Sequence, residues 1–303
     1  MNGHEQSGVA VKVTKAVLPV AGLGTRFLPA SKAIPKEMVT VVDKPVVQYV
    51  VEEALAAGIN EIVLVTHASK KAIEDHFDVN YELEAELARR SKDALLKVLR
   101  EIAPPELKVT AVRQGRALGL GHAVACARPV VGDAPFAVLL PDVLVEQVGG
   151  LSDLAAMTTR FGETGKAQVM VEPVPWERVH QYGVVDLGGV ELHQGKQAVM
   201  QQVVEKPARE AAPSNLAIVG RYVLPGTIFD LLAATAPGAG GEIQLTDAIA
   251  ALMQQSGAEA YRMRGRSFDC GSKLGYLEAT LAYGLQHPEL GADFKGLLAR
   301  YAP

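Results

Sequence analysis

Val17-Leu18-Pro19-Val20-Ala21-Gly22-Leu23-Gly24-Thr25-Arg26, followed by Lys36, is the most informative stretch of this chain. The apolar run predicts a buried strand, and Gly22 and Gly24 predict a tight loop directly after it. Glycines let the backbone approach a ligand closely and point successive N–H groups at one spot, which favours a phosphate-binding loop. A structural turn with a surface arginine is the alternative, and the additional positive charge of Lys36 weighs against it.

The loop matches neither of the two commonest phosphate-binding motifs. The dinucleotide-binding fingerprint needs a third glycine, and Phe27 stands at that position. The P-loop ends in Gly-Lys-Ser/Thr, whereas Thr25-Arg26 follow the second glycine here. The motif therefore predicts a phosphate loop of another kind, and an oxidoreductase on a Rossmann sheet is disfavoured.

Composition narrows the class of protein. The chain has 303 residues, 49% of them hydrophobic and 21% charged, which is an ordinary globular balance. A net charge of −4 gives no reason to expect nucleic acid, which needs a basic surface. Two cysteines, Cys126 and Cys270, exclude a disulfide framework. No apolar run is long enough to span a bilayer, and residues 1–12, read as a flexible tail, lack the apolar core of a signal peptide, so we expect a cytoplasmic protein without membrane contact.

Strand-like and amphipathic segments alternate through the first half of the chain. Strands are expected at 14–20, 61–66, 109–112 and 136–140, and helices at 45–58 and 69–77. This alternation predicts an α/β fold with a mixed, mainly parallel central sheet flanked by helices. The charged segment 81–102 predicts one or two helices that project from the body, either as a solvated face or as a partner-binding insertion.

The second half is richer in short strands. These are expected at 167–172, 183–187, 198–204, 216–223 and 258–263. Helices are expected at 226–234, 246–255, 272–285 and 290–300. No internal repeat or clear linker divides the sequence, so residues 13–303 are expected to form one domain, with 81–102 as a helical insertion and C-terminal helices over about 272–300.

Two aspartates are candidate metal ligands. Asp142 follows the strand expected at 136–140, and ligands bind at the carboxyl ends of such strands. Magnesium is held by one or two carboxylates together with substrate phosphates, so Asp142 suits the loop at 22–26. Asp269 also follows an expected strand, but capping the next helix is an alternative role.

Other polar residues follow strands or lie in glycine-rich loops. Glu205-Lys206 end the strand expected at 198–204, and neighbours on a strand point to opposite faces, so they need not pair. Gln114 begins a second glycine-rich loop and offers both a donor and an acceptor, which suits the edge of a nucleobase. His122 is expected in the first turn of the helix after that loop.

These pieces occur in an order that resembles the bacterial UTP–glucose-1-phosphate uridylyltransferases of the sugar-nucleotidyltransferase superfamily. The resemblance runs from about Lys15 to near Lys295. Its motifs are the loop at 18–26, Ala33-Ile34-Pro35-Lys36-Glu37-Met38, Gln114-Gly115, Gly119-Leu120-Gly121-His122-Ala123, Leu140-Pro141-Asp142, Tyr182-Gly183-Val184, Glu205-Lys206-Pro207, the segment 214–222, Glu242-Ile243-Gln244-Leu245-Thr246-Asp247 and Asp269-Cys270-Gly271. Each motif is weak alone, whereas their number and order are specific.

The resemblance implies a Rossmann-like nucleotidyltransferase fold and the reaction of UTP with glucose 1-phosphate to give UDP-glucose and pyrophosphate. The catalytic residues that it implies are Arg26, Lys36 and Lys206. The nucleotide-binding residues are Ala21, Gly22, Gly24, Thr25, Glu37, Gln114 and Gly119, of which Gln114 and Gly119 would read uracil. The sugar-binding residues are Gly183, Glu205 and Lys206. Asp142 and Asp269 would hold Mg²⁺.

Two alternatives remain open from the sequence. One is a sugar-1-phosphate nucleotidyltransferase that uses dTTP or ATP; the helical segment 81–102 and the Gly-Leu-Gly-His-Ala loop favour uridylyl transfer. The other is a non-catalytic regulator that binds nucleotide sugars, which the combination of cations with an acidic metal candidate disfavours. The resemblance also suggests a homodimer or homotetramer.

Overall fold

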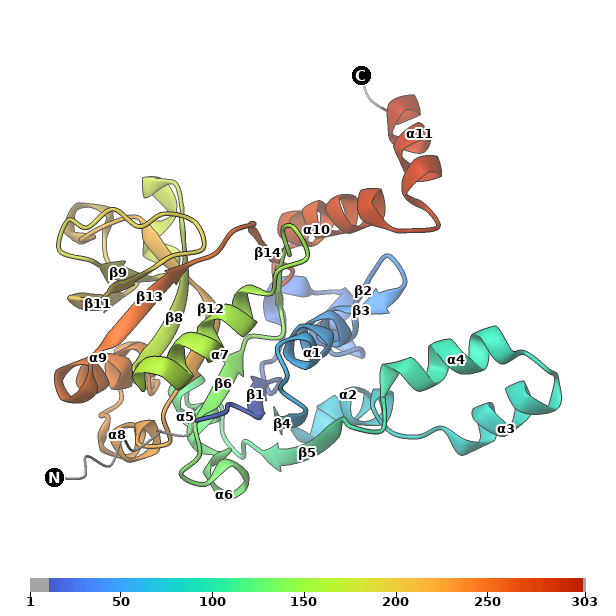
Figure 1. The fold of residues 1–303 in the computed structure, drawn as a ribbon, viewed down its shortest axis with the longest axis horizontal. Helices are drawn as coiled ribbons and strands as arrows, with labels where there is room; N and C mark the ends of the chain where they lie inside the picture. Colours follow the sequence, from blue (N-terminus) through green and yellow to red (C-terminus); the bar gives the residue numbers. More distant parts are fainter. Residues whose placement is uncertain (1–10, 302–303) are drawn as a thin grey trace, which may run out of the picture.

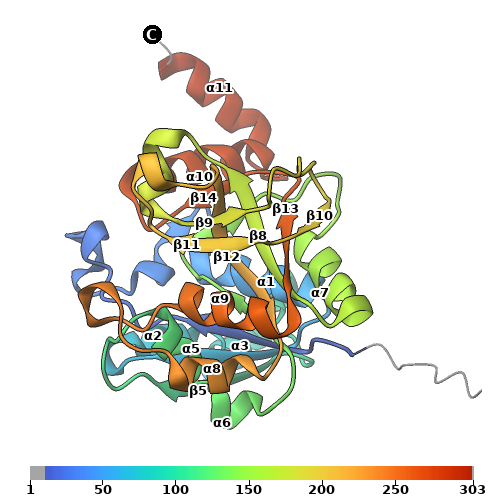
Figure 2. The ribbon, with the colours of Figure 1, turned by 90° about the vertical axis from the view of Figure 1, so that its left-hand side faces the viewer.

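The structure is a computed structural model that describes residues 11–301. The first ten residues of the expected tail, 1–12, lie outside this range. A single large sheet runs through the molecule, with helices on both of its faces (Figures 1 and 2). Among the described residues, no helix is both long and apolar enough to cross a membrane.

The sheet has the strand order β10-β13-β8-β12-β6-β1-β4-β5. The strands in this order are Gln197–Val199, Ala258–Arg262, Ala167–Pro173, Leu216–Leu224, Phe136–Leu139, Lys15–Pro19, Glu61–Thr66 and Lys108–Arg113. Strands β6, β1, β4 and β5 are parallel, as are β8 and β13, whereas β12 runs antiparallel between these two groups. The expected mixed, largely parallel α/β sheet is confirmed.

Side chains of the central strands point alternately to the two faces of the sheet, so the apolar core has one part on each face. In β1, Ala16 and Leu18 belong to one apolar cluster and Val17 to the other, because successive side chains of a strand point to opposite faces. Helices α1 (Val46–Ala56) and α7 (Asp153–Thr164) cover the first face. Helices α5 (Leu120–Ala125), α8 (Ile228–Ala234) and α9 (Leu245–Ser256) cover the second.

One sequence expectation is wrong in its detail. The run 198–204 was expected as one strand, but it forms β10 and a separate strand β11 (Gln202–Glu205). Between them the N–H of Met200 bonds to Ala258 and that of Gln201 to Asp186, so the chain passes from β13 to β9 (Gly183–Asp186). Strand β9 also touches β12, which attaches this small antiparallel ribbon to the large sheet.

Helix α7 was not expected from the sequence, although its signals are present. Ser152 caps it, since its hydroxyl accepts a hydrogen bond from the Ala155 N–H at 3.1 Å. Leu154, Met157 and Phe161 are buried at a spacing of three and four residues, as on one face of a helix.

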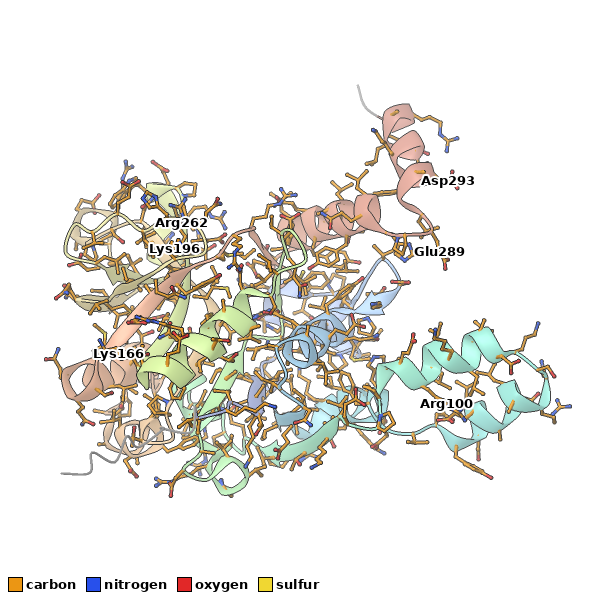
Figure 3. All side chains as sticks on the ribbon, viewed as in Figure 1. Arg100, Lys166, Lys196, Arg262, Glu289 and Asp293 are labelled. Carbon is orange, nitrogen blue, oxygen red and sulfur yellow. The ribbon has the colours of Figure 1, made fainter. Side chains whose placement is uncertain are left out.

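The charged segment forms two helices, α3 (Tyr81–Arg89) and α4 (Asp93–Ile102), which project from the body as a hairpin (Figure 1). Arg100 of α4 bonds to Glu84 of α3 at 2.9 Å, and Figure 3 shows Arg100 between the two helices. Neither helix buries a side chain. Helix α10 (Lys273–Gln286) leads to α11 (Gly291–Tyr301), which extends away from the sheet at the top of Figure 1.

The remaining elements are short. They are α2 (Lys71–His76), α6 (Arg128–Val131), the paired strands β2 (Thr40–Val41) and β3 (Lys44–Pro45), and the paired strands β7 (Val143–Val145) and β14 (Ser267–Asp269). The last pair matters for the site, because it aligns Asp269 with Val143, the residue after Asp142.

Candidate active site

The glycine-rich loop and Asp142 lie side by side at the carboxyl ends of two neighbouring strands. The loop follows β1 and Asp142 follows β6, and the two strands are parallel, with Lys15 opposite Phe136. This edge of a parallel sheet is where α/β proteins bind their ligands.

Backbone geometry explains the loop's composition. Gly24 has a φ of +68°, and a Cβ there would lie 3.2 Å from Cβ of Ser31, whose hydroxyl donates to the Gly24 carbonyl at 2.7 Å. Gly22 and Thr25 are exposed at the surface, whereas Ala21 is buried at the end of the strand. Phe27 is also buried and packs edge-on against Tyr276, with 5.3 Å between the ring centres, so it belongs to the core rather than to the loop surface.

Two cations and two aspartates from distant segments form one cluster. The Lys36 ammonium donates to Oδ2 of Asp142. The Arg26 guanidinium lies 3.9 Å from Asp142 and 3.5 Å from Asp269. Arg26 remains 65% exposed, so it is free to turn toward a ligand, while Lys36 is 16% exposed and held in place.

Gly271 occupies the centre of this cluster. A Cβ at this position would lie 2.8 Å from Asp142 Oδ2, 2.9 Å from Arg26 Nη2 and 3.0 Å from Asp269 Oδ1. Its own N–H donates to Asp269 Oδ1 at 3.0 Å. The charged groups therefore converge on a residue that has no side chain.

Asp269 does not cap the following helix. Helix α10 begins at Lys273, and Ser272 is its cap, accepting a hydrogen bond from the Gly275 N–H at 3.2 Å. The carboxylate of Asp269 thus remains directed at Arg26 and Gly271, next to Asp142.

The electrostatics of the cluster keep Asp142 ionised. Burial raises the pKa of this carboxyl, but the positive charges of Lys36 and Arg26 and the hydrogen bond from Lys36 outweigh burial, so the pKa is lowered from its ordinary value. At neutral pH the cluster contains a carboxylate that a metal ion or a cationic side chain can use.

The donor set fits a hard divalent cation. Asp142 and Asp269 supply carboxylate oxygens, and magnesium needs only one or two of these when substrate phosphates complete its coordination. Within residues 11–301 no three His, Cys, Asp or Glu side chains are placed to enclose a metal ion by themselves. A metal held here would therefore depend on a bound phosphate.

Glu37 has a different place from the one expected. Its side chain is fully buried and accepts a hydrogen bond from the Lys70 ammonium at 2.8 Å, while its other oxygen has no partner among the described residues. Burial raises the pKa of Glu37 more than the charges of Lys70 and Lys36 lower it. The carboxylate therefore lies beneath the surface of the loop, and its bond to Lys70 holds the segment that carries Lys36.

The second glycine-rich loop is tied to the segment before α9. Gln114 is buried, and its Nε2 lies 3.3 Å from the Gly119 carbonyl and 3.0 Å from Nδ1 of His122, which stands in the first turn of α5 as expected. Gly119 has a φ of +96°, and a Cβ there would lie 2.8 Å from the Ile243 carbonyl. The loop thus needs glycine for both conformation and space.

Gly183 and Glu205 form a third group of site residues. They face each other in β9 and β11, and a Cβ on Gly183 would lie 3.2 Å from Glu205 Oε2. The Thr246 hydroxyl donates to that same oxygen at 2.7 Å. This carboxylate is therefore held beside a backbone that presents no side chain.

Lys206 pairs with Glu205, which the sequence left open. Its ammonium lies 3.4 Å from Glu205 Oε1, because β11 ends at Glu205 and Lys206 adopts a φ of +44°. The Lys206 N–H donates to the Tyr182 carbonyl at 2.9 Å. Tyr182 also lines a cavity of about 380 Å³ together with Arg26, Asp142 and Asp269, which connects this group to the charged cluster.

Sequence reasoning missed several residues of the site. Gly271 and Thr246 both stand inside motifs that the sequence singled out, so their position was a signal, but nothing in the sequence shows that they touch Asp142 or Glu205. Lys70 carried no signal, because its role depends on a buried partner 33 residues earlier in the chain.

Comparisons with known proteins agree with this geometry. The sequence model of the family described as nucleotidyl transferase matches residues 15–285. A UTP–glucose-1-phosphate uridylyltransferase of Escherichia coli K12 is 59% identical, and the match covers 96% of this chain and 97% of the relative. Enzymes of the nucleotidyl transferase family generally use a divalent metal.

Solved structures give the same result. The UTP-bound UDP-glucose pyrophosphorylase of Acinetobacter baumannii superposes with a TM-score of 0.89 at 56% identity, covering 95% of this chain and 99% of the other. A UDP-glucose pyrophosphorylase complexed with UDP-glucose has a TM-score of 0.81 at 41% identity, covering 91% and 100% of the two chains. The chain therefore belongs to the nucleotidyl transferase family, as an enzyme of its UTP–glucose-1-phosphate uridylyltransferase group.

Proposed function

We propose that this protein transfers the uridylyl group of UTP to glucose 1-phosphate and releases pyrophosphate. The observation that carries the proposal is one charged cluster at the end of the first strand. Arg26, Asp142 and Asp269 converge on Gly271, and Lys36 donates to Asp142. Cations next to a carboxylate pair suit a reaction between two polyanions.

In the proposed reaction a phosphate oxygen of glucose 1-phosphate attacks the α-phosphorus of UTP in line, and pyrophosphate leaves. This nucleophile is already an anion near neutral pH, so no general base is needed. The difficulty is to bring two polyanions together, and catalysis comes from positioning and charge neutralisation.

Each cation has a separate task. Arg26 and Lys36 hold the UTP phosphates and stabilise the leaving pyrophosphate, with the exposed Arg26 able to follow it. Lys206 neutralises the phosphate of glucose 1-phosphate, which suits its 55% exposed side chain. Asp142 and Asp269 would hold Mg²⁺, which supplies additional charge neutralisation when bound.

Recognition is divided between the remaining loops. Ala21, Gly22, Gly24 and Thr25 lie along the nucleotide, and Gln114 and Gly119 read the uracil edge. Gly183 and Glu205 contact the sugar, where the carboxylate accepts hydrogen bonds from hydroxyl groups.

A substrate panel tests the nucleotide and the sugar. Pyrophosphate release is measured with UTP, dTTP or ATP against glucose 1-phosphate and galactose 1-phosphate. We expect the highest kcat/KM for UTP with glucose 1-phosphate. A preference for dTTP or ATP would contradict uridylyl transfer, and binding without turnover would indicate a regulator.

A variant tests the proposed metal ligand. Asp142→Asn should reduce kcat by at least about 10²-fold, since it removes charge from the ligand without changing size. Asp230→Asn is the matched control, because Asp230 also pairs with an arginine, Arg128 at 2.8 Å, but lies on the surface outside the site. Unaltered turnover of Asp142→Asn at saturating Mg²⁺ would remove the metal role.

We propose one domain over residues 13–303 with 81–102 as a helical insertion, a homodimer or homotetramer, and a cytoplasmic protein. Light scattering of the purified protein tests the assembly, and a monomeric mass at micromolar concentration would refute it.

A further inference from the structure

Arg221 is a fully buried arginine that the proposed reaction does not use. It lies in β12 and is 0% exposed. A buried charge is stable only when a partner neutralises it and hydrogen bonds satisfy its donors. The partners of Arg221 therefore indicate what this charge is for.

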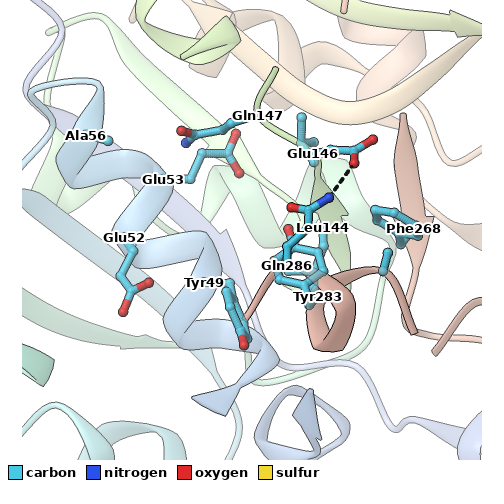
Figure 4. Close-up of a pocket in the computed structure, with 12 residues that line it drawn as sticks. Tyr49, Glu52, Glu53, Ala56, Leu144, Glu146, Gln147, Phe268, Tyr283 and Gln286 are labelled. Atoms are coloured by element: carbon cyan, nitrogen blue, oxygen red, sulfur yellow. Dashed lines mark hydrogen bonds between the residues drawn. The ribbon is translucent and has the colours of Figure 1, made fainter. Parts of the chain in front are cut away.

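One side of the guanidinium is neutralised by Glu53 of α1. Nε lies 2.9 and 3.1 Å from the two Glu53 oxygens, and Nη2 lies 2.7 Å from Oε2. Figure 4 shows Glu53 on its helix, at the edge of a second cavity of about 340 Å³ that β7, β14 and α10 also line. This bidentate pair anchors Arg221 to the helix layer.

The other side of the guanidinium binds the turn that carries Asp142. Nη1 donates to the Leu140 carbonyl at 3.1 Å, and Nη2 donates to the Val143 carbonyl at 2.7 Å. Leu140 is also bound through its N–H to the Gly220 carbonyl at 2.9 Å. Both ends of the Leu140–Val143 turn are thus attached to the same strand, and Asp142 stands between them.

Neither Arg221 nor Glu53 lines the 380 Å³ cavity that contains Asp142 and Asp269. A substrate in that cavity would not touch them. The side chain of Arg221 instead reaches this cavity through its contacts with the backbone of the Leu140–Val143 turn.

We propose that Arg221, anchored by Glu53, is a positioning residue that sets the orientation of Asp142 for the metal and the triphosphate. This inference rests on the proposed function, in which Asp142 is a metal ligand. The Lys36 ammonium already bonds to the Asp142 carboxylate. If the Leu140–Val143 turn were not fixed by Arg221, the turn could rotate and leave that carboxylate bound to Lys36 instead of the metal. Groups that orient metal ligands typically contribute 10- to 100-fold to metal affinity or activity.

The test compares variants by a readout that does not require turnover. Calorimetry measures the Kd of UTP in EDTA and in millimolar Mg²⁺, and the ratio of the two reports metal binding at the site. Arg221→Lys keeps the charge but loses the two-pronged contact with Glu53 and the turn. Glu53→Gln keeps an oxygen acceptor and weakens only the anchor, so it serves if Arg221→Lys does not fold.

A matched control separates positioning from stability. Arg160 and Glu259 form another bidentate pair, at 2.8 Å for both contacts, between α7 and strand β13. Arg160→Lys should lower the unfolding temperature while leaving the Mg²⁺-dependent gain in UTP affinity unchanged.

For Arg221→Lys we expect a UTP Kd in EDTA within about twofold of the wild type. We expect the Mg²⁺-dependent gain to fall at least about tenfold, with kcat reduced 10- to 100-fold and the KM for glucose 1-phosphate little changed. Glu53→Gln should shift the same quantities by a smaller factor. The inference would be overturned if Arg221→Lys folds and has a lowered unfolding temperature, but its UTP affinity still increases with Mg²⁺ as much as that of the wild type. A wild type that releases no pyrophosphate would instead contradict the proposed function.

Discussion

The substitution Gly271→Ala tests the geometry of the charged cluster with a single methyl group. The backbone of Gly271 does not have a positive φ, so alanine is compatible with its conformation. The cost arises from space alone. The new Cβ would lie 2.8 Å from Asp142 Oδ2 and 3.0 Å from Asp269 Oδ1, which is about 0.6 and 0.4 Å closer than ordinary van der Waals contact at 3.4 Å.

The three neighbours differ in their ability to move. Arg26 is 65% exposed and can swing away, whereas Asp142 is held by Lys36 from one side. The methyl group must therefore displace one or both carboxylates by about half an ångström. Since a misplacement of about 1 Å can cost about 10²-fold in rate, we expect kcat/KM to fall by about ten- to 10²-fold, or ~1.4 to 2.7 kcal/mol of transition-state stabilisation.

Pyrophosphate release at saturating Mg²⁺ measures the effect, and thermal unfolding shows that the variant is folded. Gly296→Ala is the control, because a Cβ on this exposed glycine of α11 meets nothing within 4 Å. It should retain full activity and gain about 1 kcal/mol of stability from helix propensity. A folded Gly271→Ala with kcat/KM within twofold of the wild type would refute the idea that the cluster is tightly packed around this residue.

Three further predictions concern other parts of the chain. Thr246→Val should raise the KM for glucose 1-phosphate about tenfold, since it removes the donor to Glu205; an unchanged KM would show that Glu205 needs no support. Burial raises the pKa of Glu259, but the hydrogen bonds from Arg160 and Gln168 and the charge of Arg160 outweigh it and lower the pKa below its ordinary 4.5. The stability from this pair is therefore present above pH 4.5 and lost as the pH falls through the lowered pKa. The unfolding temperatures of Glu259→Gln and wild type should differ at pH 7 and converge in acid. A difference in unfolding temperature that does not change with pH would contradict this. Burial and two nearby aspartates raise the pKa of Cys270 to about 12, so at pH 8 a thiol reagent should label the wild type no faster than Cys270→Ala, and an extra fast-reacting thiol would disprove it.

Much of the architecture could be predicted from local patterns. The strand at 61–66 has the expected bounds, and most other elements begin and end within two residues of their expected positions. Apolar runs and the glycine or proline residues that end them are local sequence patterns, so they predict the bounds of an element without knowledge of the tertiary contacts. The split of 198–204 was not predictable, because the chain turns where two different strands accept its hydrogen bonds.

The sequence by itself determined the strand–loop–cation motif around Gly22 to Arg26, the carboxylates after later strands and the order of motifs that identifies the family. These depend on residue type and spacing along the chain. Only the tertiary structure decided which charges meet. Asp142 and Asp269 are 127 residues apart and become neighbours through the pairing of β7 with β14.

Which charged side chains are buried was also decided only by the tertiary structure. Glu37 and Lys36 are adjacent in sequence, yet one is buried against Lys70 and the other faces Asp142. Arg221 resembles any strand residue in the sequence, and its role follows from a helix and a turn that lie 168 and 78 residues away. Such contacts are set by packing between distant segments, for which a single sequence carries no local signal.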